Sequence, residues 1–162
     1  MIGRVASGDD LRMVMRRFPS GVAVLTAEVE GENFGATIGS LVSLSLEPPL
    51  VGVSIGKQGS LHEPLRRADG FAVSLLGEGQ EAVAQHFARS GIPPVALWFG
   101  MRTRPGVRGA PLLDDAIGWL ECRTEARHDA GDHTLFIGEV ISLELGRDAP
   151  PLVYLRGEYV AP

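Results

Sequence analysis

Cysteine is almost missing from this 162-residue sequence, in which Cys122 stands alone. A single cysteine excludes an internal disulfide and any cluster of thiolate metal ligands. Its setting, Trp-Leu-Glu-Cys-Arg-Thr, is typical of a strand, so we expect a buried structural thiol. Sparing use of cysteine also fits a reducing compartment, and we expect the protein to be cytoplasmic.

Long apolar runs and an excess of positive charge are missing too. No stretch approaches the roughly 18 residues of a membrane span, and residues 1–10 lack the apolar centre of a signal peptide. Lysine and arginine total 15 against 20 aspartates and glutamates, which gives a formal net charge of −5. An acidic surface repels nucleic acid and anionic membranes, so we expect neither as a partner.

Motifs for metal binding and nucleophilic catalysis are also absent. The four histidines have no metal-ligand spacing, and no cysteine cluster accompanies them, so we expect no metal. No Gly-x-Ser-x-Gly turn is present, which makes Ser40 and Ser43 poor candidates for an activated nucleophile. The histidines are His62, His86, His128 and His133.

The patterns that are present indicate one mainly β domain over residues 1–162, a β-barrel or sandwich with a few short helices. Strands and helices do not alternate as they do in a doubly wound sheet. Residues 91–115 are rich in proline and glycine, and we expect a long irregular segment there. We expect a helix with Ser60 as its N-cap and Glu63 completing a capping box. The predicted strands cover 22–29, 36–46, 50–55, 71–76, 117–127, 134–145, 152–155 and 158–160, and the predicted helices cover 7–17, 60–67 and 80–88.

The segment Gly77-Glu78-Gly79-Gln80-Glu81-Ala82 reads Gly-x-Gly-x-x-Ala and joins a predicted strand to a predicted helix, as a dinucleotide-binding fingerprint does. Two glutamates, however, place negative charge where a pyrophosphate would lie. No acidic strand end follows at the spacing that holds a ribose. The interpretation favoured here is a turn followed by a helix start, where glutamate is favourable.

Residues 35–45 alternate hydroxyl-bearing and small side chains with apolar ones. Small residues let a flat ligand approach the main chain, and hydroxyls with free amides can bind phosphate. A half-exposed strand with serines facing water is the alternative. Similarly, His133 after Gly131-Asp132 suits either a surface turn or a ligand contact.

Taken together, six segments make the sequence similar to the short-chain flavin reductase family. They occur in the family's order and cover nearly the whole chain. The resemblance implies the FMN-binding split barrel, a Greek-key-like β-barrel. It is strongest to the reductase components of two-component flavin-dependent monooxygenases. The segments are FPSGVAVLTA (18–27), GATIGSLVSLSLEPPLVGVSIG (35–56), FAVSLLGEGQEAVAQHFA (71–88), APLLDDAIGWLECR (110–123), GDHTLFIGEV (131–140) and PLVYLRGEY (151–159).

The resemblance assigns roles to particular residues. Thr37 and Ser40 stand where the family has flavin-facing hydroxyls, while Gly39 departs from the commoner serine or asparagine. His133 matches the histidine that contacts the nicotinamide, and we expect it to orient that ring without acting as a base. The cofactor-binding residues implied in this way are Ala36, Thr37, Ile38, Gly39, Ser40, Leu41, Val42, Ser43, Ser54, Ile55, Gly56, Lys57, Ser60, Phe87, Arg89, His133 and Tyr154.

The implied reaction is hydride transfer from NADH, with NADPH as the alternative, to FMN or FAD. The chemistry belongs to the cofactors, and the protein contributes alignment and exclusion of water. The resemblance also implies a homodimer that releases reduced flavin to a separate monooxygenase. The sequence leaves FMN and FAD open, and Arg102, Arg104 and Arg108 are candidates for the 2′-phosphate of NADPH.

Two other functions fit the same barrel. One is a carrier or sensor that holds FMN tightly without catalysis. The other is an interaction module that binds no flavin, in which case no flavin would raise the melting temperature.

Overall fold

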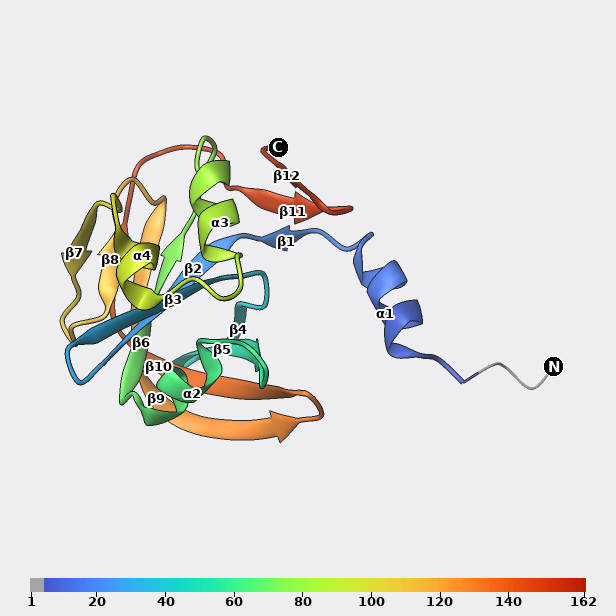
Figure 1. The fold of residues 1–162 in the computed structure, drawn as a ribbon, viewed down its shortest axis with the longest axis horizontal. Coiled ribbons are helices and arrows are strands. Elements are labelled where there is room, and N and C mark those ends of the chain that lie inside the picture. Colours follow the sequence, from blue (N-terminus) through green and yellow to red (C-terminus); the bar gives the residue numbers. More distant parts are fainter. Residues whose placement is uncertain (1–4) are drawn as a thin grey trace.

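The computed structural model describes residues 5–162 and is dominated by one seven-stranded antiparallel sheet (Figure 1). Side chains from β2 and β5, which are far apart in the sheet order, meet in one core. The sheet therefore curls into a barrel, and the predicted mainly β architecture is confirmed. In sheet order its strands are β3 (Glu32–Ile38), β2 (Ala23–Val29), β6 (Gly70–Leu75), β9 (Gly118–Ala130), β10 (His133–Leu145), β5 (Pro49–Gly56) and β4 (Val42–Leu46).

Two smaller sheets and four short helices complete the described chain. The small sheets contain β1 (Ser20–Gly21), β11 (Val153–Leu155) and β12 (Glu158–Val160), and β7 (Thr103–Pro105) and β8 (Pro111–Leu113). The helices are α1 (Gly8–Met15), α2 (His62–Arg67), α3 (Glu81–Phe87) and α4 (Pro94–Trp98). None of these helices is long and apolar enough to cross a membrane.

The barrel interior is filled by large apolar side chains that alternate along the strands. Phe136 from β10 and Leu25 from β2 are completely buried there, and Leu65 of α2 covers one end. Cys122 lies in the same core, where burial and, second, the charge of Glu121 raise the pKa of its thiol to about 12. The expected buried structural thiol is therefore confirmed.

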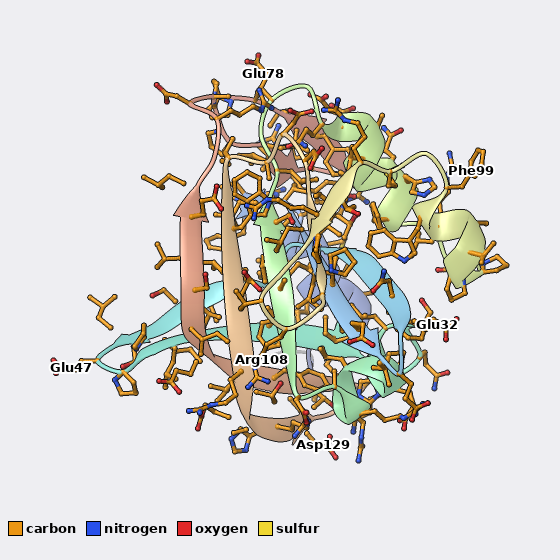
Figure 2. The ribbon with its side chains drawn as sticks, turned by 90° about the vertical axis from the view of Figure 1, so that its left-hand side faces the viewer. Glu32, Glu47, Glu78, Phe99, Arg108 and Asp129 are labelled. Carbon is orange, nitrogen blue, oxygen red and sulfur yellow. The ribbon has the colours of Figure 1, made fainter. Side chains whose placement is uncertain are left out.

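A second apolar cluster lies on the outer side of β2, beneath α3 and α4. Val24, Phe87 and Leu97 pack together in it. Phe87 also meets Trp98 edge to face, with ring centroids 5.2 Å apart. This packing fixes the end of α3, where the candidate site begins. Figure 2 shows Phe99, beyond α4, and Glu47, at the tip of the β4–β5 hairpin, on opposite sides of the molecule.

The predicted continuous strand over 36–46 is wrong. The structure divides it into β3 and β4, with a turn through Gly39, because its two ends join opposite edges of the sheet. Glycine suits the turn because a Cβ there would lie 2.7 Å from Ser20 Oγ. The division turns residues 36–40 toward the α2 end of β5.

Three further expectations about local structure need correction. Helix α2 begins at His62 with Leu61 as its N-cap, so Ser60 lies outside the helix and makes no capping hydrogen bond. Residues 91–115 are not irregular throughout, since they form α4, β7 and β8. The β9–β10 turn is also tighter than predicted, because pairing continues to His133 opposite Ala130.

Helix α1 begins as predicted, since Ser7 Oγ accepts from the Asp10 amide and Asp10 reaches back to the Ser7 amide. Its apolar side chains do not enter the barrel core, and none of its residues is buried. Figure 1 shows the helix standing to one side of the barrel. An apolar helix face left in water points to a further contact.

Candidate functional site

Four separate segments of the chain surround one pocket, which we call the β3–β5 pocket. Its volume is about 570 Å³, within the roughly 300–1,000 Å³ common to small-molecule sites. The segments are the end of β3 with the following turn, the end of β5, the turn into α2, and the residues after α3. They contribute Ala36, Thr37, Ile38, Gly39, Ser40, Ser54, Ile55, Gly56, Gln58, Gly59, Ser60, Leu61, Phe87, Ala88, Arg89, Ser90 and Gly91.

Most of the residues that the resemblance assigned to flavin binding line this pocket. Those brought together there are Ala36, Thr37, Ile38, Gly39, Ser40, Ser54, Ile55, Gly56, Ser60, Phe87 and Arg89. The segments they come from are distant in sequence, and the fold joins them at one end of the barrel. Whether they bind flavin stays a prediction.

The other assigned residues lie outside the lining. Leu41 faces a separate apolar crevice beside Leu152, and Val42 and Ser43 continue into β4, away from the turn. Lys57 pairs with Asp129 at 3.6 Å. The first three follow the turn at Gly39 and Ser40, where the chain leaves the pocket to enter β4.

Tyr154 also lies apart from the pocket, on β11, where its ring packs at 5.2 Å from that of Tyr159. It lines a different hollow next to Ser20 and Gly39. Its predicted place as a wall of the β3–β5 pocket is therefore not what the structure shows.

The sequence interpretation missed six lining residues in the turns that flank α2 and α3. All but Leu61 share small size or a polar side chain at a helix boundary, which is the signal that could have identified them. The missed residues are Gln58, Gly59, Leu61, Ala88, Ser90 and Gly91.

The two hydroxyls expected to face the flavin are already engaged with the main chain. Thr37 Oγ1 donates to the Ala84 carbonyl at 2.7 Å. Ser40 Oγ donates to the Ser54 carbonyl at 2.9 Å and accepts from the Ser54 amide at 3.1 Å. These hydroxyls therefore hold the pocket's walls together, and only their remaining lone pairs are available to a ligand.

Free hydrogen-bond donors lie at the α2 end of the pocket instead. Within the described chain, the Ser60 and Ser90 hydroxyls and the Ser60 and Leu61 amides make no hydrogen bond. Arg89 adds a positive charge, and no described lining residue carries a carboxylate. Unpaired amides, hydroxyls and a guanidinium without a competing anion form a suitable environment for phosphate.

Glycines bring the main chain close to the interior of the pocket. Gly39, Gly56 and Gly59 supply lining without side chains. A Cβ on Gly56 would lie 3.6 Å from His133 Nε2, so the imidazole stands against the rim of the pocket. A flat ring system could approach the main chain here, and the residues present therefore fit a flavin.

His133 is held at the start of β10 by its neighbour. Its Nδ1 lies 2.8 Å from Asp132 Oδ1, and this hydrogen bond, followed by the charge of His133, lowers the pKa of the Asp132 carboxyl. The bond fixes the imidazole ring so that Nε2 faces Gly56. Because its side chain is about half exposed, His133 can meet a ligand that covers the pocket.

A network of polar side chains next to His133 supports the same rim of the β3–β5 pocket. Buried His62 bonds Thr134 Oγ1 at 2.8 Å, and Thr134 donates to Asp129 Oδ1 at 3.0 Å. The Thr134 hydrogen bond and then the charge of Lys57 lower the pKa of Asp129. The network ties the β9–β10 hairpin to the turn that leads into α2.

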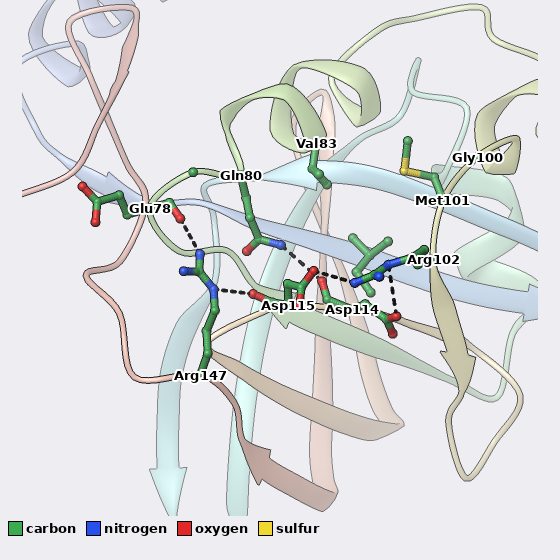
Figure 3. A pocket seen from close by; sticks show the side chains of 11 residues that line it. Glu78, Gln80, Val83, Gly100, Met101, Arg102, Asp114, Asp115 and Arg147 are labelled. Atoms are coloured by element: carbon green, nitrogen blue, oxygen red, sulfur yellow. Dashed lines mark hydrogen bonds and ion pairs between the residues drawn. The ribbon is translucent and has the colours of Figure 1, made fainter.

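A second pocket, of about 670 Å³, lies at the opposite end of α3 (Figure 3). Its arginines are already engaged: Arg147 Nε donates to the main-chain carbonyl of Asp115 at 2.7 Å, and Arg102 pairs with the Asp115 carboxylate at 2.9 Å. Gln80 donates to the Asp114 carbonyl at 3.3 Å. This pocket, which we call the Arg102–Arg147 pocket, contains none of the residues that the resemblance assigned to cofactor binding, but it includes Arg102, a candidate for the 2′-phosphate of NADPH.

The Gly77–Ala82 segment does not form a dinucleotide fingerprint. Strand β6, which precedes it, pairs antiparallel with both β2 and β9, so the parallel strands of a βαβ unit are missing there. Gly77 is needed because a Cβ would lie 2.5 Å from Ile117.

The described residues bring together no group of three potential metal ligands. The β3–β5 pocket contains small residues, hydroxyls and amides, without a nucleophile next to a base. What such a pocket can do is bind a flat, phosphate-bearing molecule and leave one of its faces open to a second reactant at His133.

Comparison with known proteins agrees with this geometry. Residues 15–162 match the family model described as the flavin reductase like domain. The chain is 41% identical over 145 residues to the reductase component of 4-hydroxyphenylacetate 3-monooxygenase from Thermus thermophilus, covering 90% of each protein. It is 41% identical over 155 residues to an NADH-dependent FMN reductase from Streptomyces nodosus, covering 93% of this chain and 82% of that protein.

Comparison with solved structures also finds flavin reductases. The NADH:FAD oxidoreductase of Streptomyces globisporus superposes with a TM-score of 0.90 at 35% identity, covering 99% of this chain and 98% of that one.

Proposed function

This chain belongs to the flavin reductase-like domain family, and from that premise we propose that it is an NADH-dependent flavin reductase acting on FMN or FAD. The observation that carries the proposal is the β3–β5 pocket. It offers main chain and small side chains on one wall, free amides and hydroxyls at the α2 end, and no carboxylate among its described residues. That combination suits an isoalloxazine ring with its phosphate.

A bound flavin supplies a ring that accepts hydride and later passes electrons on. The chain's own residues bind and align the reactants. Residues 36–40 and Gly56 form the surface for the ring, and Ser60, Arg89 and Ser90 are placed to hold the phosphate. His133, fixed by Asp132, orients the nicotinamide, and this alignment replaces acid–base catalysis.

We propose that the flavin is a diffusible substrate which leaves in its reduced form for a separate monooxygenase. The hydroxyls of Thr37 and Ser40 are already engaged, and Lys57 is paired with Asp129, so the hold on the flavin is weak. One relative is itself the reductase component of a monooxygenase. NADH is the proposed donor, and measured rates with NADPH decide the alternative.

We also propose a homodimer. Strand β4 and the distal half of β10 expose apolar side chains, including Leu46 at 88% and Leu145 at 89%. Monomeric proteins rarely leave so many apolar side chains uncovered on neighbouring elements. Sedimentation of the wild-type chain is expected to give a dimer, and Leu143→Glu is expected to yield monomers. A wild-type monomer at micromolar concentration would contradict this.

The remaining assignments follow from the same function. We propose a cytoplasmic location, because the reaction uses free NADH and the single cysteine is a buried free thiol. The family match over 15–162 supports one domain as the working unit of the chain.

The test begins with the protein as purified. We expect a preparation with little bound flavin that oxidises NADH only after FMN or FAD is added. A stoichiometric yellow protein that is inert toward both NADH and NADPH would identify a flavin carrier instead. If FMN, FAD and riboflavin all leave the melting temperature unchanged, the barrel binds no flavin and the proposal fails.

His133→Ala tests the orienting role. We expect the KM for NADH to rise by about tenfold, the cost of losing roughly one charge-assisted or well-placed hydrogen bond, with a smaller fall in kcat. His128→Ala, a change to another exposed histidine on the same hairpin, serves as the control. A fall in kcat by orders of magnitude at unchanged KM would instead make His133 an essential base.

A further inference from the structure

A groove lies beside the β3–β5 pocket, between α1 and the small sheet of β1, β11 and β12. Its volume is about 300 Å³, and we call it the α1 groove. Gly39 lines both this groove and the β3–β5 pocket. The two hollows therefore adjoin at a residue without a side chain.

The groove collects positive charge in a chain that is acidic overall. Arg12, Arg16 and Arg156 line it, and no carboxylate does so among residues 5–162. The Arg156 amide donates to the Arg16 carbonyl at 2.9 Å, and the Arg16 guanidinium reaches the Arg156 carbonyl at 3.5 Å. The two residues are therefore held side by side.

Arg16 and Arg156 have no counter-ion within the described chain. Arg12 differs, because its Nη1 pairs with Asp9 Oδ1 at 2.8 Å. Neighbouring guanidiniums without a carboxylate repel one another, and a bound anion with several oxygens removes that repulsion. Two of the three arginines that the sequence suggested for a phosphate are already paired, Arg102 with Asp115 at 2.9 Å and Arg104 with Glu144 at 2.5 Å.

Helix geometry explains only part of this cluster. Arg16 is the C-cap of α1, where a cation is favourable beside the negative end of the helix dipole. Arg156 belongs to the turn between β11 and β12, and no helix accounts for its position. It takes the left-handed conformation at φ 56°, which places it against the end of α1.

Two aromatic side chains complete the groove. Phe18 is 66% exposed and Tyr154 is 42% exposed, and both line it. Exposed aromatic rings provide stacking surfaces for a base, and guanidiniums bind phosphate oxygens. Aromatic rings next to unpaired arginines are the chemistry that recognises a nucleotide.

We propose that the α1 groove binds the adenosine diphosphate half of a dinucleotide whose reactive half lies at the β3–β5 pocket. The inference rests on the proposed function and names the part of the substrate that the pocket does not hold. NADH and FAD both carry this half, whereas FMN does not. Figure 1 shows α1 and the β9–β10 turn, where His133 begins β10, projecting on the same side of the barrel.

The first test uses ADP itself and needs no catalysis. Calorimetric titration of the full chain is expected to show ADP binding that weakens with added salt, because the contacts are charged and exposed. The double variant Arg16→Gln/Arg156→Gln is expected to bind ADP at least about tenfold more weakly. Arg17→Gln removes the same charge next to the groove without touching it, and we expect it to bind as the wild type does.

The second test assigns the dinucleotide by steady-state kinetics. If NADH provides the bound half, the double variant raises the KM for NADH with either flavin. If FAD provides it, the KM for FAD rises while the KM for FMN does not change. In both cases kcat at saturation is expected to stay close to the wild-type value, and Tyr154→Ala is expected to raise the same KM.

Two results would overturn the inference: wild-type protein that does not bind ADP, or a double variant with unchanged ADP affinity and unchanged KM values. The melting temperature and circular dichroism of each variant exclude misfolding as a cause. Failure of the proposed function is a separate outcome. It would abolish NADH oxidation with every flavin, whereas the ADP titration would still test binding in the groove because it needs no catalysis.

Discussion

The two ends of helix α3 carry pockets of similar size and different character. The β3–β5 pocket, of about 570 Å³, has walls of main chain and small side chains with unpaired amides and hydroxyls. The Arg102–Arg147 pocket, of about 670 Å³, is lined by two arginines that already bind carboxylates or main-chain carbonyls of the protein. Volume alone would favour the second. What distinguishes a binding site is hydrogen-bonding capacity that the protein itself does not use.

The largest expected effect comes from filling each pocket in turn. Gly56→Leu places a branched side chain at the rim of the β3–β5 pocket, where a Cβ would lie in ordinary contact with the His133 ring. We expect the KM for FMN to rise by about a hundredfold or more, equivalent to ~3 kcal/mol of lost binding. Fluorescence titration with FMN measures the same change without turnover.

Met101→Phe is the matched change in the Arg102–Arg147 pocket. We expect it to leave both KM values within about twofold of the wild type, less than ~0.5 kcal/mol. If this variant loses flavin binding and Gly56→Leu does not, the two pockets have been assigned the wrong way round.

The next effect concerns a hydroxyl that supports the pocket wall. Ser40→Ala leaves the Ser54 amide and carbonyl without their side-chain partner. We expect a loss of about 1–2 kcal/mol in the free energy of unfolding, measured by urea denaturation, together with weaker flavin binding. Ser43→Ala, on exposed β4, is the control and is expected to change stability by less than about 0.5 kcal/mol. Equal losses in the two variants would show that Ser40 has no special role.

A smaller effect is expected at the boundary between the pocket and the α1 groove. Gly39→Ala puts a Cβ 2.7 Å from Ser20 Oγ, and Ser20 must move aside. We expect a several-fold rise in the KM for the dinucleotide, and removing the Ser20 side chain in Gly39→Ala/Ser20→Gly is expected to restore most of it. A double variant no better than Gly39→Ala would place the cause elsewhere.

The smallest effect concerns pH and the ionic network at the pocket rim. The Thr134 hydrogen bond and then Lys57 lower the folded-state pKa of Asp129 from 3.8. A depressed carboxyl pKa contributes stability that is present above the unfolded pKa and is lost as pH falls through the folded pKa. Asp129→Asn is therefore expected to flatten the decline in melting temperature below about pH 4. Asp148→Asn, which removes a carboxylate that has no ion-pair partner among residues 5–162, is the control, and equal flattening by it would contradict the assignment.

Local patterns in the sequence were enough for the elements whose side chains alternate regularly. The buried run over 50–55 appears as β5, and the turn predicted over 128–132 appears, shortened, between β9 and β10. The break at Gly39 could not be read in this way, because residues 36–46 keep a strand-like composition through the turn. Only the packing of Ser20 against Gly39 and the separation of the sheet edges show it.

The residues of the candidate site also fall into those that the sequence identified and those whose position only the structure shows. The resemblance named Ser54, Gly56 and Phe87, which line the pocket, because motifs keep residues in order along the chain. It also named Tyr154, which the structure places in the α1 groove. Motif order carries no information about which side of a strand or turn a residue occupies. The free amides before α2 could not be predicted from the sequence either, because they depend on the residue at which the helix begins.

Hydrogen–deuterium exchange with and without saturating FMN tests the central claim most directly, because it localises the ligand on the chain. The account predicts new protection in the segments that line the β3–β5 pocket, at 36–40, 54–61 and 87–91, and unchanged exchange at 100–102 and 113–115. Protection confined to the Arg102–Arg147 pocket, or no protection in any segment, would contradict it.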